Sequence, residues 1–263
     1  MNRNDISARF FLRDKYETEL FRLLDRIETS IEKNIFKNTN FVDPYIASIC
    51  NDVLENNYSH VKYIITGGYK DAERKVIIIY PDYYHKSHDL LPLKVLKIED
   101  FPRGKEFNHR EVLGTILGLG LKREKIGDII ISGDMLQIIV LEEVASYIEL
   151  NLTQIGRFKV KAYIDEIHNI IPRENEFKLI TDTVKSLRLD SVSSVGFNES
   201  RNRTVEDIRK EKVKVNFIPI LTPSYNVKEG DLISYRGKGR ILLEKVLGKT
   251  KKDRYKILIK KFI

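Results

Sequence analysis

The chain has few of the residues that stabilise small secreted domains or build thiolate metal sites. Its 263 residues include one cysteine, Cys50, and no tryptophan. A single cysteine excludes an internal disulfide framework and any metal site made of several cysteines. Because structural disulfides are typical of oxidising compartments, this composition agrees with a cytoplasmic location.

Long apolar runs are missing as well. The longest, such as residues 135–145 (MLQIIVLEEVA), are far shorter than the roughly 20 residues that a membrane-spanning helix requires. The first residues (MNRNDISARFFLRDKYETEL) are charged and contain no apolar stretch of the kind found in secretory signals. We therefore expect a cytoplasmic protein with no membrane partner.

Charge is abundant, but its sign changes along the chain. The net charge is +8, yet residues 181–263 hold 20 Lys and Arg against 10 Asp and Glu, while residues 1–180 hold 26 against 28. The excess of positive charge is therefore confined to the last third of the chain. Such confinement favours a polyanion-binding surface over general solubility, and on charge alone RNA, DNA and an anionic membrane are all candidates.

Length and hydrophobic periodicity predict a multidomain α+β protein. Residues 5–36 repeat apolar side chains at helical spacing, and Pro44 suits the first turn of a second helix. Two β-strands follow, at 61–67 and 74–81, which completes an N-terminal α+β domain over residues 1–85.

Residues 90–168 show the element order β-α-β-β-α-β, which predicts a ferredoxin-like domain with the architecture of RNA-recognition motifs. Asn108 is the candidate N-cap of its first helix. The aromatic residues that stack on bases in RNA-recognition motifs are missing from the central strands. The expected last strand, 157–167, carries Arg157, Lys159 and Lys161 on one face. Lysines that protect an edge strand from aggregation are the simpler interpretation, and a secondary RNA contact is the alternative.

The segment 187–234 predicts a helix, a glycine-containing turn, a second helix from about Ser200, and short strands. Arg201 falls in the first turn of the second helix, where free backbone N–H groups favour a phosphate. Arg203 and Lys210 are seven residues apart, so they share the exposed face of that helix. The helix is thus apolar on one side and basic on the other.

This segment resembles an S4 RNA-binding domain, whose motif residues appear here in matching order. They are Arg188-Leu189-Asp190, Gly196, Ser200-Arg201, Ile208, Val213-Lys214-Val215-Asn216 and Gly230-Asp231. The chain departs from the pattern at Glu211 and Phe217, where glycine is usual. The resemblance implies an S4 domain within residues 181–263 and makes its basic ridge the RNA-binding surface. The candidate contacts on the ridge are Arg188, Ser200, Arg201, Arg203, Lys210, Lys212 and Lys214. For Arg188, a structural role anchoring Asp190 or Glu199 is an equal alternative.

A basic β-hairpin is predicted after the S4 segment. Two alternating strands flank the sequence GKTKKDR at 248–254. Four cations therefore crowd the tip of the hairpin: Lys249, Lys251, Lys252 and Arg254. These are further candidates for contact with an RNA backbone, and a solvated loop is the alternative.

Three blocks together resemble the YlmH family of bacterial S4-domain proteins: residues 63–84 (YIITGGYKDAERKVIIIYPDYY), residues 109–129 (HREVLGTILGLGLKREKIGDI) and the S4 segment. The resemblance implies a monomeric factor that binds the large ribosomal subunit. Its partners would be ribosomal RNA and tRNA or peptidyl-tRNA, and it would act in quality control of stalled translation.

An enzyme that modifies or processes RNA, with the S4 domain as its targeting module, is the alternative function. No phosphate-binding loop is present, and the glycines of GTILGLG at 114–120 lie in a predicted helix. His85 and His88, near Asp82 and Asp89, lack a further ligand cluster, so a solvated loop is the simpler interpretation. We expect no catalytic residue, no metal and no cofactor.

Overall fold

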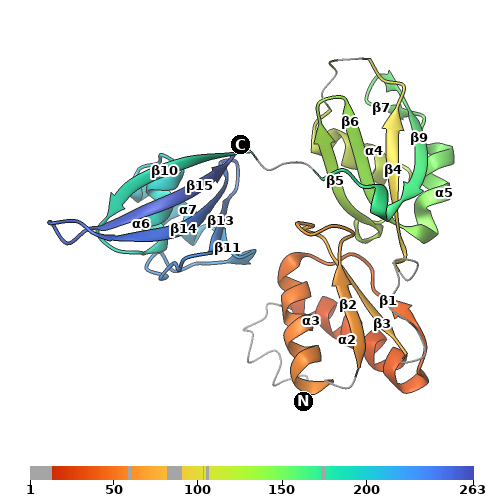
Figure 1. The fold of residues 1–263 in the computed structure, drawn as a ribbon, viewed down its shortest axis with the longest axis horizontal. Helices are drawn as coiled ribbons and strands as arrows, with labels where there is room; N and C mark the ends of the chain where they lie inside the picture. The colour runs from red at the N-terminus through yellow and green to blue at the C-terminus, as the bar shows by residue number, and fades with distance from the viewer. Residues whose placement is uncertain (1–13, 59–60, 82–90, 103, 105–106, 173–175) are drawn as a thin grey trace. The chain divides into compact units, whose positions relative to one another are not determined.

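The computed structural model describes residues 14–58, 61–81, 91–102, 104, 107–172 and 176–263. They form two compact units, Met1–Arg173 and Glu174–Ile263. Helices and sheets occur in both units, so the predicted mixed α and β architecture is confirmed. Figure 1 shows the elements of each unit.

The N-terminal part of the first unit places two helices against a three-stranded sheet of order β1-β3-β2. Its elements are α2 (Asp14–Lys33), β1 (Lys37–Asn38), α3 (Pro44–Asn57), β2 (Lys62–Thr66) and β3 (Val76–Tyr80). Leu20, Leu24 and Ile27 are buried on α2 at the spacing of one helical face. Pro44 occupies the first turn of α3, where its missing N–H leaves no hydrogen bond unmade.

The middle part of the first unit is a four-stranded sheet with two helices on one face. Its main elements are β4 (Leu93–Glu99), α4 (His109–Gly118), β5 (Ile126–Ser132), β6 (Met135–Leu141), α5 (Glu142–Asn151) and β9 (Lys161–Glu166), with short 3-10 turns at Arg123–Lys125 and Ile167–Asn169. The sheet order is β5-β6-β4-β9 with every neighbouring pair antiparallel, which is the arrangement of a split βαβ sheet. Asn108 caps α4, since its side chain accepts a hydrogen bond from the Glu111 N–H at 2.8 Å.

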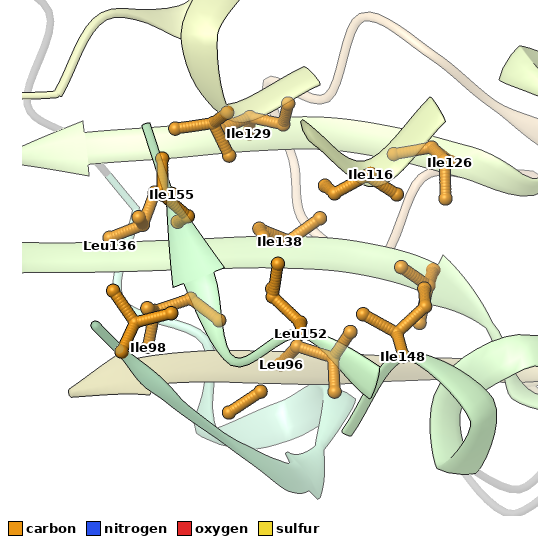
Figure 2. Close-up of a cluster of buried hydrophobic side chains, with 14 of the residues drawn as sticks. Leu96, Ile98, Ile116, Ile126, Ile129, Leu136, Ile138, Ile148, Leu152 and Ile155 are labelled. Atoms are coloured by element: carbon orange, nitrogen blue, oxygen red, sulfur yellow. The ribbon is translucent and has the colours of Figure 1, made fainter. Parts of the chain in front are cut away.

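Isoleucine and leucine side chains fill the space between this sheet and its helices. Figure 2 shows Ile116 from α4, Ile148 from α5 and Ile138 from β6 converging in one buried cluster. All three are fully buried. The apolar side chains of the two helices and those on one face of the strands therefore pack together in a single layer.

The predicted single strand at 157–167 is wrong, because the chain turns within it. A small hairpin forms first, from β7 (Gln154–Ile155) and β8 (Phe158–Lys159), and only then does β9 join the sheet. Gly156 has φ +58°, a left-handed conformation that glycine adopts without steric strain. Arg157 consequently lies in a turn and does not share a strand face with Lys161.

The second face of the middle sheet is covered by the N-terminal part. Leu93 and Val95 of β4 and Ile139 of β6 join one buried cluster with β3 side chains such as Ile78. Gln137 of β6 is also buried, and its side-chain amide exchanges two hydrogen bonds with the backbone of Ile171. The central strands of the middle sheet are therefore buried on both faces.

Asp128 on β5 fixes the N-terminal part to this sheet. Its carboxylate accepts hydrogen bonds from the Tyr69 hydroxyl (2.9 Å), the Glu73 N–H (2.7 Å) and the Arg74 N–H (3.0 Å). All three donors lie in the turn between β2 and β3. A carboxylate that accepts several N–H and O–H bonds is strongly oriented, so this residue sets how the two parts meet.

The second unit carries two helices on one face of a six-stranded sheet of order β10-β15-β14-β13-β11-β12. Its elements are β10 (Phe177–Val184), α6 (Leu189–Gly196), α7 (Arg201–Arg209), β11 (Val213–Val215), β12 (Ile218–Pro219), β13 (Leu232–Tyr235), β14 (Gly239–Lys249) and β15 (Tyr255–Phe262). Strand β10 had no counterpart in the sequence interpretation, and it pairs with β15 along its whole length. The hairpin of β14 and β15 is present as expected.

The positions where this unit departs from the S4 pattern keep glycine-like backbone conformations. Glu211 has φ +58°, and Phe217 has φ +69° beside Asn216 at +48°. Asn216 and Phe217 form the two-residue turn between β11 and β12, a hairpin turn that requires positive φ at both positions. The turn geometry is thus retained, at a local strain of about 1–2 kcal/mol for a bulky residue such as Phe217.

We expect Asp128→Ala to lower the free energy of unfolding of the first unit by roughly 2–4 kcal/mol, because two backbone N–H groups lose their acceptor. Urea unfolding followed by circular dichroism measures this change. Tyr69→Phe is the matched control, since it removes one of the three bonds and leaves the carboxylate in place. Equal effects of the two substitutions would show that Asp128 does not anchor the contact.

Candidate nucleic-acid interface

The candidate interface begins where the N-termini of α6 and α7 meet. Ser200 is the N-cap of α7, and its hydroxyl accepts a hydrogen bond from the Arg203 N–H at 3.3 Å. The Ser200 carbonyl also accepts from the Thr204 N–H at 3.0 Å, which closes the first turn. The capped turn holds Arg201 and Arg203 in fixed positions at the surface.

A buried carboxylate draws two arginines together at this point. Asp190 is 2% exposed and accepts from Arg188 at 2.9 and 3.2 Å and from Arg201 at 3.1 and 3.3 Å. Burial alone would raise the pKa of Asp190, but the hydrogen bonds from Arg188 and Arg201 outweigh it, and the net shift is downward. Asp190 therefore stays ionised and holds both guanidinium groups.

The two arginines still present donors to solvent. Their side chains are 40% and 50% exposed for Arg188 and Arg201, and a guanidinium has five N–H donors, of which Asp190 takes only part. The structural role considered for Arg188 is therefore observed, since it pairs with Asp190. Its contact with RNA stays a prediction, as does that of Arg201.

A second buried carboxylate organises the other end of α7. Asp207 accepts from Lys212 at 2.8 Å, from the Tyr235 hydroxyl at 2.7 Å and from Arg203 at 3.4 Å. The bonds from Lys212 and Tyr235 lower the pKa of Asp207 to about 2, against a smaller opposing effect of burial. Burial and the bond to Asp207 raise the pKa of Tyr235. Arg203 and Lys212 are thus fixed by one anion, in the same way as Arg188 and Arg201.

The other residues predicted for the ridge are placed differently. Lys210 at the end of α7 is 62% exposed and lies 3.6 Å from Glu206. Lys214 lies on β11 between the buried Val213 and Val215, whose side chains face the helices. Since alternate residues of a strand point to opposite faces, Lys214 lies on the face of the sheet away from α6 and α7.

Two of the four cations at the hairpin tip are engaged in contacts, one within the tip and one with β10. Lys249 pairs with Asp253 at 2.7 Å and lies 5.0 Å from the ring centre of Tyr255. Arg254 donates to the side chain and carbonyl of Thr183 on β10 at 3.0 and 2.6 Å. Lys251 and Lys252 are exposed. Strand β13 pairs only with the start of β14, at residues 239–242, so the hairpin tip extends beyond that pairing. Its cations form a group separate from the ridge.

Sequence reasoning singled out the cations and named Asp190 as an alternative partner of Arg188, but it missed the bond from Arg201 to Asp190 and the role of Asp207. The signal was present for Asp207, since Arg203 and Asp207 are four residues apart on one helix. No such local signal links Asp190 to Arg201. The region of His85 and His88 lies outside the described residues. Within the described part of the chain, no cluster of three or more potential metal ligands occurs, and no helix is long and apolar enough to cross a membrane.

Family models match three successive stretches of the chain. Three family models match: "YlmH, N-terminal" over residues 15–84, "Putative RNA-binding domain in YlmH" over residues 89–169, and "S4 domain" over residues 187–233. The chain is also 34% identical over 226 residues to the Bacillus subtilis (strain 168) "Ribosome-associated protein quality control protein P2". That alignment covers 86% of this chain and 87% of the relative. The chain belongs to the YlmH family.

Part of this chain shares its fold with a solved structure. The "Cell division protein ylmH from Streptococcus pneumoniae" superposes with a TM-score of 0.53 at 18% sequence identity. The superposition covers 61% of this chain and 96% of that chain. At this identity the likeness concerns the fold alone.

The depressed pKa of Asp207 predicts a specific acid sensitivity of the second unit. An ordinary aspartate has a pKa of about 3.9, so the contribution of Asp207 to folding is complete above about pH 4 and is lost as the pH falls towards 2. Asp207→Asn should therefore lower stability at neutral pH and flatten the dependence between pH 4 and 2. Chemical unfolding at several pH values measures this. Glu206→Gln, at the exposed neighbouring residue, is the control, and an unchanged profile for Asp207→Asn would contradict the assignment.

Proposed function

We propose that this YlmH family member is a non-catalytic RNA-binding factor of the large ribosomal subunit, acting as a monomer in the cytoplasm. Its partners would be ribosomal RNA and peptidyl-tRNA on subunits left by stalled translation. The observation that carries the proposal is the pair of buried carboxylates, Asp190 and Asp207, each of which fixes two cations at the surface of the S4 domain.

The chemistry of this surface suits RNA phosphates. Arginine guanidinium groups bind phosphate oxygens through paired N–H donors, and an anchored side chain loses less conformational entropy on binding. Structured RNA is recognised mainly through its shape and backbone, which favours a rigid ridge over a base-reading pocket. The S4 surface offers such a ridge at Arg188, Arg201 and Arg203.

The step from RNA to the ribosome is supported by the relative. The Bacillus subtilis protein is named for ribosome association and for protein quality control, and it matches this chain across most of both lengths. We infer the same place of action here. Ribosomal RNA and peptidyl-tRNA are the phosphate-rich partners available on a stalled large subunit.

The direct test is sedimentation of the tagged chain from a lysate through a sucrose gradient, followed by sequencing of crosslinked RNA. We expect co-migration with large subunits and crosslinks to both ribosomal RNA and tRNA. Migration as free protein, with crosslinks to one precursor RNA, would instead favour the alternative role in RNA modification or processing.

Arg201→Ala should weaken RNA binding by roughly 1–3 kcal/mol, the range of a charge-assisted contact, with similar losses for RNAs of different sequence. The slope of log affinity against log salt should also decrease by about 1, because one phosphate contact is lost. Fluorescence anisotropy with labelled RNA hairpins at several KCl concentrations measures both. Arg26→Ala, at an exposed arginine of α2, is the matched control and should leave both quantities unchanged.

A further inference from the structure

The middle part cannot bind RNA in the manner of an RNA-recognition motif. Domains of that architecture stack bases on aromatic side chains of the two central strands, on the sheet face opposite the helices. In this chain the central strands are β4 and β6, and the corresponding face holds Leu93, Val95 and Ile139, which are fully or almost fully buried against the N-terminal part. Any RNA contact of the middle part must use another surface.

An exposed basic and aromatic edge remains at the β7–β8 hairpin and β9. Arg157, Lys159 and Lys161 are all exposed, and among the described residues no carboxylate lies within ion-pair distance of any of them. Lys161 faces Glu99 across the paired strands. The middle part has no general excess of positive charge, so this cluster is a local feature. Three exposed cations within five residues suit successive backbone phosphates.

Aromatic rings lie directly beside two of these cations. The Arg157 guanidinium carbon is 5.2 Å from the ring centre of Phe158, and the Lys161 ammonium is 4.7 Å from that of Tyr163. Both rings are partly exposed. Unpaired RNA bases stack on aromatic rings and on guanidinium planes, and the adjoining cations meet the phosphates between them.

The hairpin is held rigidly enough to serve as a platform. Ile155 of β7 is fully buried in the core of the middle part, and the Phe158 ring packs edge-on against Phe107 with centres 6.1 Å apart. The turn between the strands lies against α4, where a side chain at Gly156 would meet the Glu111 carboxylate at 2.4 Å. The backbone that presents Arg157 is therefore fixed from both sides.

We propose that Arg157, Phe158, Lys159, Lys161 and Tyr163 form a second RNA contact, which takes backbone phosphates and stacks unpaired bases. This inference rests on the proposed function in that the chain binds RNA, but it uses a surface separate from the S4 domain. The simpler explanation is that the cations protect β9, the edge strand of its sheet, from pairing with other chains. If the cations only protect the edge strand, their removal should cause aggregation and should leave the affinity for RNA unchanged.

The first experiment uses the full chain with Arg157→Gln and Lys159→Gln combined, and a labelled RNA stem–loop with an unpaired 3′ extension. We expect roughly tenfold weaker binding at low salt and a salt slope reduced by about 2, one for each lost phosphate contact. The matched control combines Arg110→Gln and Lys122→Gln, two exposed cations elsewhere in the middle part. Unchanged affinity and slope in the first variant would overturn the proposal, and aggregation without those changes would support edge protection instead.

The second experiment uses the absence of tryptophan from the chain. Tyr163→Trp introduces a single tryptophan at the proposed contact, which can be excited at wavelengths where tyrosine does not absorb, and addition of the same RNA should quench its emission. Tyr147→Trp, at a 46% exposed position on α5, is the control and should not respond. RNA binding with no quenching at position 163 would refute the stacking role.

The outcomes separate this inference from the proposed function. If Arg201→Ala weakens RNA binding and the Arg157 and Lys159 variant does not, the result supports the S4 surface and refutes the second contact. If the Arg157 and Lys159 variant binds RNA normally but no longer binds purified large subunits, the edge contacts a protein and the proposal is wrong. Failure of the unaltered chain to bind any RNA would overturn both.

Discussion

The ion pairs of Asp190 with Arg188 and Arg201 are the interaction on which the basic surface depends. Like charges placed this close repel one another, and long cationic side chains ordinarily remain mobile. A buried anion between them removes the repulsion and fixes their geometry, provided that it stays ionised, as the lowered pKa of Asp190 indicates. Asp207 repeats the arrangement with Arg203 and Lys212. The basic surface that we propose for RNA is thus assembled around internal anions.

The first unit meets a different constraint, the burial of both faces of one sheet. The central strands β4 and β6 carry buried apolar side chains on both of their faces, so exposure of either face would be unfavourable. Helices α4 and α5 cover one face, and the N-terminal part covers the other. Asp128 fixes the orientation of the N-terminal part on the sheet, because its three hydrogen-bond donors all belong to the turn between β2 and β3. The N-terminal part therefore completes the core of the middle part.

Sequence patterns predicted most of these elements because the deciding signals are local. The Asn108 cap, the alternation in β5 and β6, and the hairpin of β14 and β15 all depend on residues close in the chain. Strand β10 was missed because its partner β15 lies more than seventy residues later, and long-range pairing leaves no local period. The last strand of the middle part was overextended because the alternation of polar and apolar residues runs without a break from Arg157 through β8 into β9.

The candidate site was predictable in composition but not in arrangement. The S4 pattern identified which cations to consider, while the assignment of Lys214 to the opposite face of the sheet and of Arg254 to Thr183 required the packed structure. The burial of Asp190 and Asp207 could not be predicted, because a sequence does not distinguish a buried aspartate from a solvated one. Their roles follow from burial and partners, which only the fold supplies.

The pairing of β10 with β15 has a consequence for the second unit as a module. The first strand of the unit and its last strand are neighbours over eight residue pairs, and the Ile263 N–H donates to the Glu176 carbonyl at 3.1 Å. Entry and exit of this unit therefore lie side by side. A domain whose ends are adjacent can be inserted into a surface loop of another protein without stretching either junction. The same closure makes the unit suitable for circular permutation, with new ends opened at an exposed turn.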